Sequence, residues 1–257
     1  MFDPSTDFPT VEQRLAFLGL MPSASNDYVA PITPRSLAVA QPRTASIHTR
    51  AAIAGSTIVS VDGAVSEDDE SDVLDCALYL EQYTDTKYDR ETEWYEWLQH
   101  YTLGLWNLGW IHQRPVMLES RRTVLYEPIT HTILDTLKPQ ASGPMYTAAM
   151  ESFEALKGNL QASMLLAQTS GRERGRQFQI MPCAYDVRGR LTLMLIHSWY
   201  LAAVNPEQFL FVKWLDHDVT LIQHYGSFTL DRKRFDGVAA AMRAKITERS
   251  RDYLLRM

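Results

Sequence analysis

The most reactive side chains in this sequence are two cysteines, and no familiar catalytic motif surrounds either of them. Cys183 lies in the middle of RQFQIMPCAYD, an alternating run whose two faces both become apolar toward the centre. Cys76 falls on the apolar face of a predicted helix, which favours packing over chemistry. Two cysteines are too few for a disulfide-stapled scaffold, so we expect two reduced thiols, with a single bridge as the alternative.

A cysteine nucleophile paired with a histidine is the enzyme hypothesis that these residue types allow. Cys183 and His197 lie on neighbouring predicted strands of one hairpin. A turn centred near Gly189 places Cys183 opposite residues 192–195, so His197 is out of register by a few residues. A catalytic thiol also needs an accessible, electropositive site, which an apolar strand does not supply. The sequence favours a non-enzymatic protein, with a Cys/His hydrolase or acyltransferase as an alternative.

The charged clusters are typical of ordinary structure, so we predict no metal site. The run SEDDESD at Ser66–Asp72 lacks the register of an EF-hand loop and suits the negative first turn of a helix. Asp216–Asp218 falls in a predicted turn, and no two histidines have ligand spacing. The basic loop at Ser170–Gly175 is read as a solvated turn. Phosphate-loop, dinucleotide and nucleophile-elbow motifs are absent, so no cofactor is expected.

Composition narrows the class of partner. The hydrophobic fraction of 46% and the charged fraction of 22% are those of a chain that buries a core. A net charge of −6 argues against nucleic-acid binding and against simple attachment to anionic lipid. The N-terminus lacks the pattern of a signal peptide, and the apolar window Leu191–Val204 is shorter than the ~20 residues that span a bilayer. We expect a cytoplasmic protein, or one released without a classical signal peptide.

Hydrophobic periodicity predicts an α+β fold with a mainly antiparallel sheet. Short turns join four consecutive C-terminal strands into a meander: Arg176–Asp186, Leu191–Ala202, Phe209–Trp214 and Val219–Tyr225. Further strands are predicted at Thr57–Val61 and within Trp110–Tyr126, where Pro115 indicates an edge. Helices that pack on the sheet are predicted at Asp72–Tyr83, Thr92–Leu108, Thr130–Leu137, Pro144–Lys157, Leu160–Thr169 and Arg232–Leu255.

The chain divides into an N-terminal part, residues 1–50, and a single α+β domain, residues 51–257. A capping box at Thr10–Gln13 starts a short helix over Val11–Leu18. A Pro-, Ser- and Ala-rich arm follows it. An arm of this kind can dock on a neighbouring subunit, so a self-assembling structural or protein-interaction protein, with a homo-oligomer as its form, is an alternative function.

Two stretches carry a resemblance to a known family. They are VLDCALYLEQYTDTKYDRETEWYEWLQHYTLGLWNLGW at Val73–Trp110, and FQIMPCAYD paired with a C-terminal LD…F…V…I…Y helix. Together they resemble the Evf-like (Erwinia virulence factor) bacterial proteins over about residues 59–255. The resemblance implies a single α/β-type domain and a buried cysteine that carries palmitate as a thioester. Cys183 is the matching position, whereas Cys76 lies on a helix rather than in the sheet.

The resemblance implies a virulence-associated, lipid-binding protein without enzymatic activity. Its partner would be a fatty acyl chain or a membrane, and release of the chain would attach the protein to a host membrane. The expected lining of the lipid site is Phe178, Ile180, Met181, Leu193 and Leu195. Burial of an acyl chain is worth ~0.8 kcal/mol per CH₂, so sixteen carbons amount to on the order of 10 kcal/mol.

Overall fold

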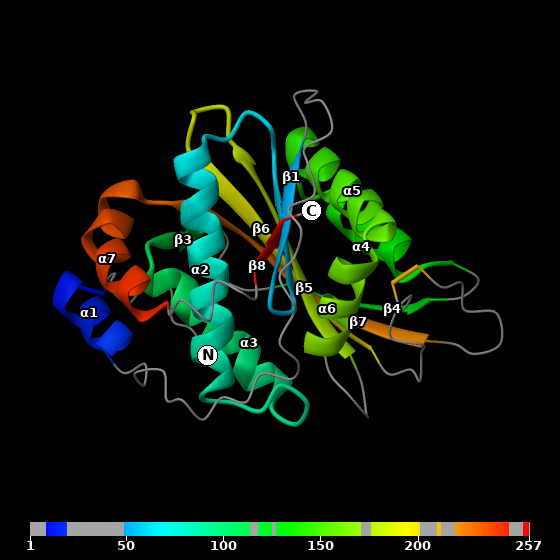
Figure 1. The fold of residues 1–257 in the computed structure, drawn as a ribbon, viewed down its shortest axis with the longest axis horizontal. Coiled ribbons are helices and arrows are strands. Elements are labelled where there is room, and N and C mark those ends of the chain that lie inside the picture. The colour runs from blue at the N-terminus through cyan, green and yellow to red at the C-terminus, as the bar shows by residue number, and fades with distance from the viewer. Residues whose placement is uncertain are drawn as a thin grey trace.

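The fold is a single mixed sheet enclosed between two layers of helices (Figure 1). It is known from a computed structural model, which describes residues 9–19, 49–113, 118–124, 127–170, 176–200, 210–211, 219–246 and 254–256. Helices α2, α3 and α7 lie on one side of the sheet and helices α4, α5 and α6 on the other (Figure 1). The predicted α+β class is confirmed.

The sheet has eight strands in the described part of the chain. They are β1 Arg50–Ala54, β2 Thr57–Val61, β3 Trp110–His112, β4 Leu118–Val124, β5 Arg176–Tyr185, β6 Leu191–Tyr200, β7 Val219–Leu230 and β8 Leu254–Arg256. Their order is β3-β7-β6-β5-β2-β1-β8, and β4 pairs with β7 as well. The β2–β5 pair is parallel, and the other described pairs are antiparallel.

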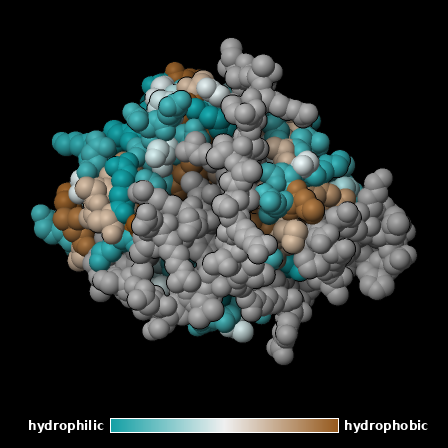
Figure 2. Space-filling view, viewed as in Figure 1, coloured by the Kyte–Doolittle hydropathy of each residue, from teal (hydrophilic) through white to brown (hydrophobic). Residues whose placement is uncertain are grey.

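Seven helices accompany these strands in the described residues. They are α1 Val11–Gly19, α2 Glu67–Asp85, α3 Trp94–Asn107, α4 Ile129–Leu137, α5 Gly143–Gly158, α6 Leu160–Thr169 and α7 Arg232–Lys245. The described surface in Figure 2 is mostly hydrophilic, with small apolar patches beside α1 and α7 and beside α4 to α6. Helix α1 packs on α7, and the predicted arm that follows α1 lies outside the described residues.

In the described residues, the predicted four-strand meander is a three-strand meander. Strands β5, β6 and β7 are antiparallel neighbours, as expected. The predicted strand Phe209–Trp214 is wrong at Leu210 and Phe211, which form a turn, and its other residues lie outside the described part. Because β6 already pairs with β5 on one edge and with β7 on the other, it has no free edge for a further strand.

The C-terminal helix is shorter than predicted. Asp231 caps α7 as expected, since its side chain accepts a hydrogen bond from the Arg234 backbone N–H at 3.1 Å. The helix ends at Lys245, with Ile246 in an extended conformation. Leu254–Arg256, predicted as helical in part, instead pairs with β1. Without β8, the backbone groups on one edge of β1 would lack partners. Pairing with this distant strand therefore overrides the helical pattern of the local sequence.

Several local signals are confirmed at atomic detail. The Thr10 backbone N–H donates to Gln13 Oε1 at 2.8 Å, and the Gln13 backbone N–H donates to Thr10 Oγ1 at 3.3 Å, which is the predicted capping box. Ser66 caps α2, so the acidic run forms the first turn of that helix. Gly189 has φ +72° in the turn between β5 and β6, a conformation that favours glycine.

The sheet separates two hydrophobic cores. The first lies between the sheet and helices α2, α3 and α7; it contains both cysteines, and we call it the cysteine layer. The second lies between the sheet and helices α4, α5 and α6, and we call it the opposite layer. Strand β5 is buried over nearly its whole length, as its two-sided apolar sequence predicted. Its odd-numbered residues Met181 and Cys183 belong to the cysteine layer, whereas Phe178 and Ile180 belong to the opposite layer.

Candidate functional site

Cys183 lies at the centre of the sheet and is fully buried. It faces Leu193 of β6 on one side and Val61 of β2 on the other. Its Sγ donates a hydrogen bond to the Met181 carbonyl at 3.4 Å. Burial raises the pKa of the Cys183 thiol well above its usual range, and the nearby Cys76 adds to the rise. At neutral pH the side chain is therefore a protonated thiol.

Cys76 belongs to the same layer but is held differently. It projects from α2 and accepts a hydrogen bond from Trp110 Nε1 at 3.5 Å. Burial raises the pKa of Cys76 to about 12, and the Trp110 hydrogen bond opposes part of this rise. Both cysteines are fully buried, and no disulfide joins them in the structure.

The structure does not bring Cys183 and His197 together as a catalytic pair. His197 lies directly opposite Gln179, four residues from the position that faces Cys183, which confirms the predicted register. Its Nε2 instead contacts Gln177 Oε1 at 3.1 Å. Burial lowers the pKa of His197 to about 3, with smaller contributions from His224 and Arg90. His197 is a neutral imidazole within a polar cluster.

Three of the five predicted lipid-site residues share a layer with Cys183. Met181, Leu193 and Leu195 are fully buried in the cysteine layer. Phe178 and Ile180 are fully buried in the opposite layer. The reason is the strand period of two, which sends even- and odd-numbered residues of β5 to opposite faces. Of the five predicted residues, Met181, Leu193 and Leu195 therefore lie on the same side of the sheet as Cys183.

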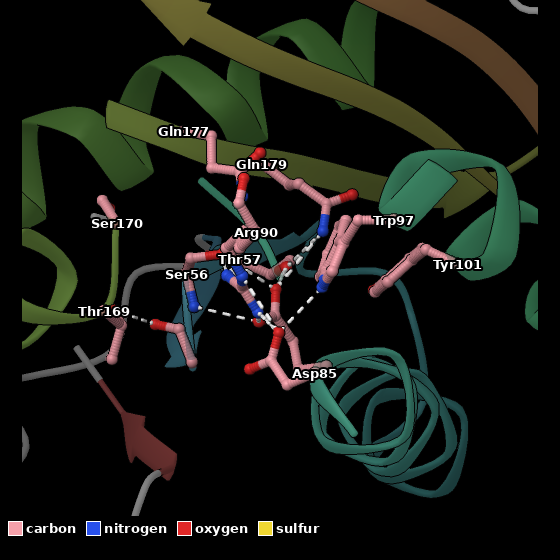
Figure 3. Close-up of polar contacts among 12 residues, drawn as sticks. Ser56, Thr57, Asp85, Arg90, Trp97, Tyr101, Thr169, Ser170, Gln177 and Gln179 are labelled. Carbon is pink, nitrogen blue, oxygen red and sulfur yellow. Dashed lines mark hydrogen bonds and ion pairs between the residues drawn. The ribbon is translucent and has the colours of Figure 1, made fainter. Parts of the chain in front are cut away.

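A buried polar cluster lies beside the cysteine layer, centred on Arg90 in the connection between α2 and α3 (Figure 3). The guanidinium of Arg90 pairs with Glu81, and with Asp85 at 2.6 Å. It also lies over the Trp97 ring, 4.3 Å from the ring centroid. Trp97 Nε1 donates to Asp85 Oδ1 at 2.7 Å. The Arg90 side chain is 12% exposed, so these contacts replace its water.

Glu81 connects this cluster to the sheet. Its carboxylate accepts hydrogen bonds from Thr57 Oγ1 at 2.5 Å, Ser56 Oγ at 3.1 Å and Gln179 Nε2 at 3.3 Å. A Cβ at Gly55 would lie 2.7 Å from Glu81 Oε2, and Gly55 has φ +60°. The turn between β1 and β2 therefore requires glycine for two reasons, its conformation and the close carboxylate.

The cluster holds two carboxylates against one guanidinium. Burial alone would lower the pKa of Arg90, but Asp85 and Glu81 reverse this and raise it. Burial raises the pKa of Asp85, and Arg90 opposes the rise. Removing one partner of such a buried pair leaves an uncompensated charge and costs about 3–5 kcal/mol. Through Glu81, Arg90 therefore holds the α2–α3 connection against the sheet.

A second polar group, with members on β5, β6 and β7, adjoins the cluster. Gln177 Nε2 donates to the Arg90 carbonyl at 2.6 Å, and Gln177 Oε1 contacts His197. His197 lies directly opposite His224 in the β6–β7 ladder. The Trp94 ring, at the start of α3, lies 6.1 Å from the His197 ring and 5.4 Å from the His224 ring. A continuous path of contacts thus joins Arg90 to both histidines.

Sequence reasoning missed the polar cluster, although a signal was present. Gln177 and Gln179 are polar residues that precede the apolar centre of the strand, and they share a face with Met181 and Cys183. Buried polar side chains need partners, so two glutamines in this position indicate a polar cluster. The identity of the partner, Arg90, is set by how the helices pack.

Other predicted features are settled only in part. Within the described residues, no three His, Cys, Asp or Glu side chains are arranged to hold a metal ion. Asp216–Asp218 and residues 171–175 of the basic loop lie outside the described part. None of the described helices is both long and apolar enough to cross a membrane.

Comparisons with known proteins gave matches among solved structures alone. No family model matches it, and no curated protein matches it. A structure described as that of the Evf virulence factor is similar at a TM-score of 0.34 and 7% identity, covering 72% of this chain and 73% of that one. A delta-endotoxin structure is similar at a TM-score of 0.36 and 11% identity, covering 78% of this chain and 89% of that one. Two of the structural neighbours are thus a virulence factor and a toxin, and the resemblance to each is weak.

Proposed function

We propose that this protein carries a fatty acyl chain as a thioester on Cys183 and encloses the chain in the cysteine layer. The observation that supports this proposal is the position of the thiol. Cys183 is fully buried in an apolar layer beside Met181, Leu193 and Leu195. An acyl chain attached there leaves water, and each buried CH₂ contributes ~0.8 kcal/mol.

The attachment reaction needs an acyl donor of the thioester class, such as an acyl-coenzyme A. The Cys183 thiol loses its proton, and its sulfur bonds to the acyl carbonyl carbon. The sulfur–carbon bond of the donor breaks, and the proton passes to the leaving thiolate. Because burial raises the pKa of Cys183, this step belongs to a stage at which the cysteine layer is open. The closed layer then protects the thioester from water.

The sequence resemblance to Evf-like proteins supports a virulence-associated role for the acylated protein. In this role the chain leaves the cysteine layer and inserts into a host membrane, while the folded domain stays at the membrane surface. One acyl chain alone gives only reversible membrane binding, so a second contact would accompany it. The protein itself needs no catalytic residue for this function.

Intact-mass spectrometry tests the proposal on protein purified from cells of the organism that encodes it. We expect a mass increment equal to a fatty acyl group, which neutral hydroxylamine removes because it cleaves thioesters. Cys183→Ser should lose the increment, whereas the matched variant Cys76→Ser should keep it. A protein at its plain sequence mass contradicts the proposal, as does an increment that survives in Cys183→Ser.

A further inference from the structure

Two buried histidines form a pair that the proposed acyl site does not use. His197 of β6 and His224 of β7 are direct partners across the ladder, with exposed fractions of 1% and 5%. Their Nε2 atoms contact oxygen atoms, Gln177 Oε1 at 3.1 Å and Glu119 Oε2 at 3.4 Å. Neither Nδ1 has a hydrogen-bond partner among the described residues. Each imidazole is thus enclosed in its neutral form.

The start of α3 covers this pair. The Trp94 ring lies against both imidazole rings, and Tyr95 lies 6.1 Å from the His224 ring. Trp94 follows directly on the α2–α3 connection, which Arg90 fastens to α2 and to Gln177. The sheet lies beneath the two histidines and the start of α3 lies over them, so movement of this end of α3 would expose them to water.

We propose that His197 and His224 form an acid sensor beneath Trp94, and that their protonation releases the α2–α3 connection and the start of α3 from the sheet. The proposal concerns the unmodified chain and does not depend on acylation of Cys183. Its ligand is the proton, and its moving part is residues 86–101.

The sign of the effect follows from the direction of the histidine pKa shifts. Burial lowers the pKa of both His197 and His224 in the closed state. In an opened state each histidine regains a pKa near 6.5. The two histidines therefore favour the closed state fully above about pH 6.5. Below that pH the opened state becomes more populated, because its histidines take up protons. His197 therefore shifts the opening equilibrium by about tenfold per pH unit between that pH and its lowered pKa, and His224 adds to the shift in the same direction.

The surrounding charges act on this equilibrium in both directions. Arg90 and His224 lower the pKa of His197 further. Because two charged imidazoles repel one another, a proton on one histidine makes protonation of the other less favourable in the closed state. Glu119 of β4 attracts a proton to His224 and opposes part of the burial effect. Asp85 acts in the opposite sense, because its pKa is raised in the closed state and a proton there favours closure. Within the described residues, Glu81 of α2 and Tyr101 of α3 also interact with Arg90.

Hydrogen exchange of the full-length, unmodified protein from pH 7.5 to pH 5 tests the proposal, after correction for the intrinsic exchange rate. We expect protection of residues 86–101 to fall by about tenfold per pH unit below about pH 6.5 through His197, with a further fall in the same direction through His224. Helices α4, α5 and α6 should keep their protection over the same range. The double variant His197→Gln/His224→Gln should lose the pH dependence. His197→Gln alone should remove the larger part of the slope and His224→Gln the smaller part.

Two matched histidine controls separate this local release from general acid unfolding. His131 is exposed on α4, and His112 on β3 has a pKa that burial lowers to about 4. His131→Gln and His112→Gln should both leave the response of residues 86–101 unchanged. Equal slopes in the wild-type protein and in the double variant overturn the proposal. Loss of protection in α4, α5 and α6 at the same pH also overturns it.

Discussion

The two helical layers of this protein satisfy their buried polar groups in different ways. In the opposite layer two buried side-chain contacts are neutral, the Ser60 Oγ to Ser152 Oγ hydrogen bond of 2.8 Å and the Thr136 Oγ1 to Gln223 Oε1 bond of 2.8 Å. The guanidinium of Arg176, which is buried on the same face, donates to the Ala167 carbonyl at 2.6 Å and stays charged at every physiological pH. The cysteine layer borders a cluster of buried charges around Arg90, with two neutral histidines beside it. One sheet thus has a face that pH changes little and a face that protons can destabilise.

The difference indicates which layer is able to open. A neutral hydrogen bond contributes about 0.5–1.5 kcal/mol and does not respond to pH near neutrality. A buried ion pair contributes little net stability over an apolar packing, but losing one partner is very costly. A few groups, Arg90 with its two carboxylates and the two histidines, therefore stabilise the closed cysteine layer. In our proposal, a change in the charge of one of them is enough to open it.

Arg90→Met should give the largest loss of stability. It leaves Glu81 and Asp85 without their cation, and we expect the free energy of unfolding to fall by about 3–5 kcal/mol. Urea denaturation measures the change. The control is Arg190→Met, which removes an exposed pair with Asp186 in the β5–β6 turn and should cost at most about 1 kcal/mol. Equal losses in the two variants would remove the distinction between the layers.

Gly55→Ala should give an intermediate loss on the same side of the sheet. The substitution forces φ +60° on a residue with a Cβ, and that Cβ lies 2.7 Å from Glu81 Oε2. We expect a cost of about 1–2 kcal/mol from the conformation, plus the displacement of the carboxylate. Gly143→Ala, where no atom lies within 4 Å of the added Cβ, is the matched control and should be close to neutral. Thermal unfolding of both variants measures the difference.

Ser152→Ala tests the opposite layer. Ser152 accepts from Ser60 and donates to the Ala149 carbonyl at 2.7 Å. Its removal should cost about 1 kcal/mol, because Ser60 loses its partner in a buried position. The loss should be the same at pH 7.5 and pH 5.5, since neither hydroxyl titrates in this range. A loss that changes with pH would show that the two layers are coupled.

Arg243→Gln should have the smallest effect. Arg243 pairs with Asp72, and with Asp75 at 3.0 Å, at the rim between α7 and α2, where its side chain is 42% exposed. Solvent weakens this attraction, so we expect a loss of at most about 1 kcal/mol. High salt should remove most of the difference from the wild-type protein. A loss comparable to that of Arg90→Met would mean that charge alone, and not burial, holds the layer.

Prediction from sequence worked where neighbours along the chain decide the structure. The capping box at Thr10–Gln13 and the cap at Asp231 were read from residues three positions apart, and both form. The strand at Phe209–Trp214 failed at Leu210 and Phe211, because an apolar run does not reveal whether a sheet edge is free to accept it. The same limit applied to Leu254–Arg256, whose partner β1 lies about two hundred residues earlier in the chain.

By itself the sequence determined the α+β class, most helix boundaries and the two-sided burial of Cys183, because these depend on periods of two and 3.6 residues and on local caps. Only the tertiary structure decided that β2 runs parallel to β5, and that Glu81 meets Gln179 from 98 residues away. It also decided that His197 and His224 face one another beneath Trp94. Such meetings depend on how whole layers pack, and no short-range pattern encodes that arrangement.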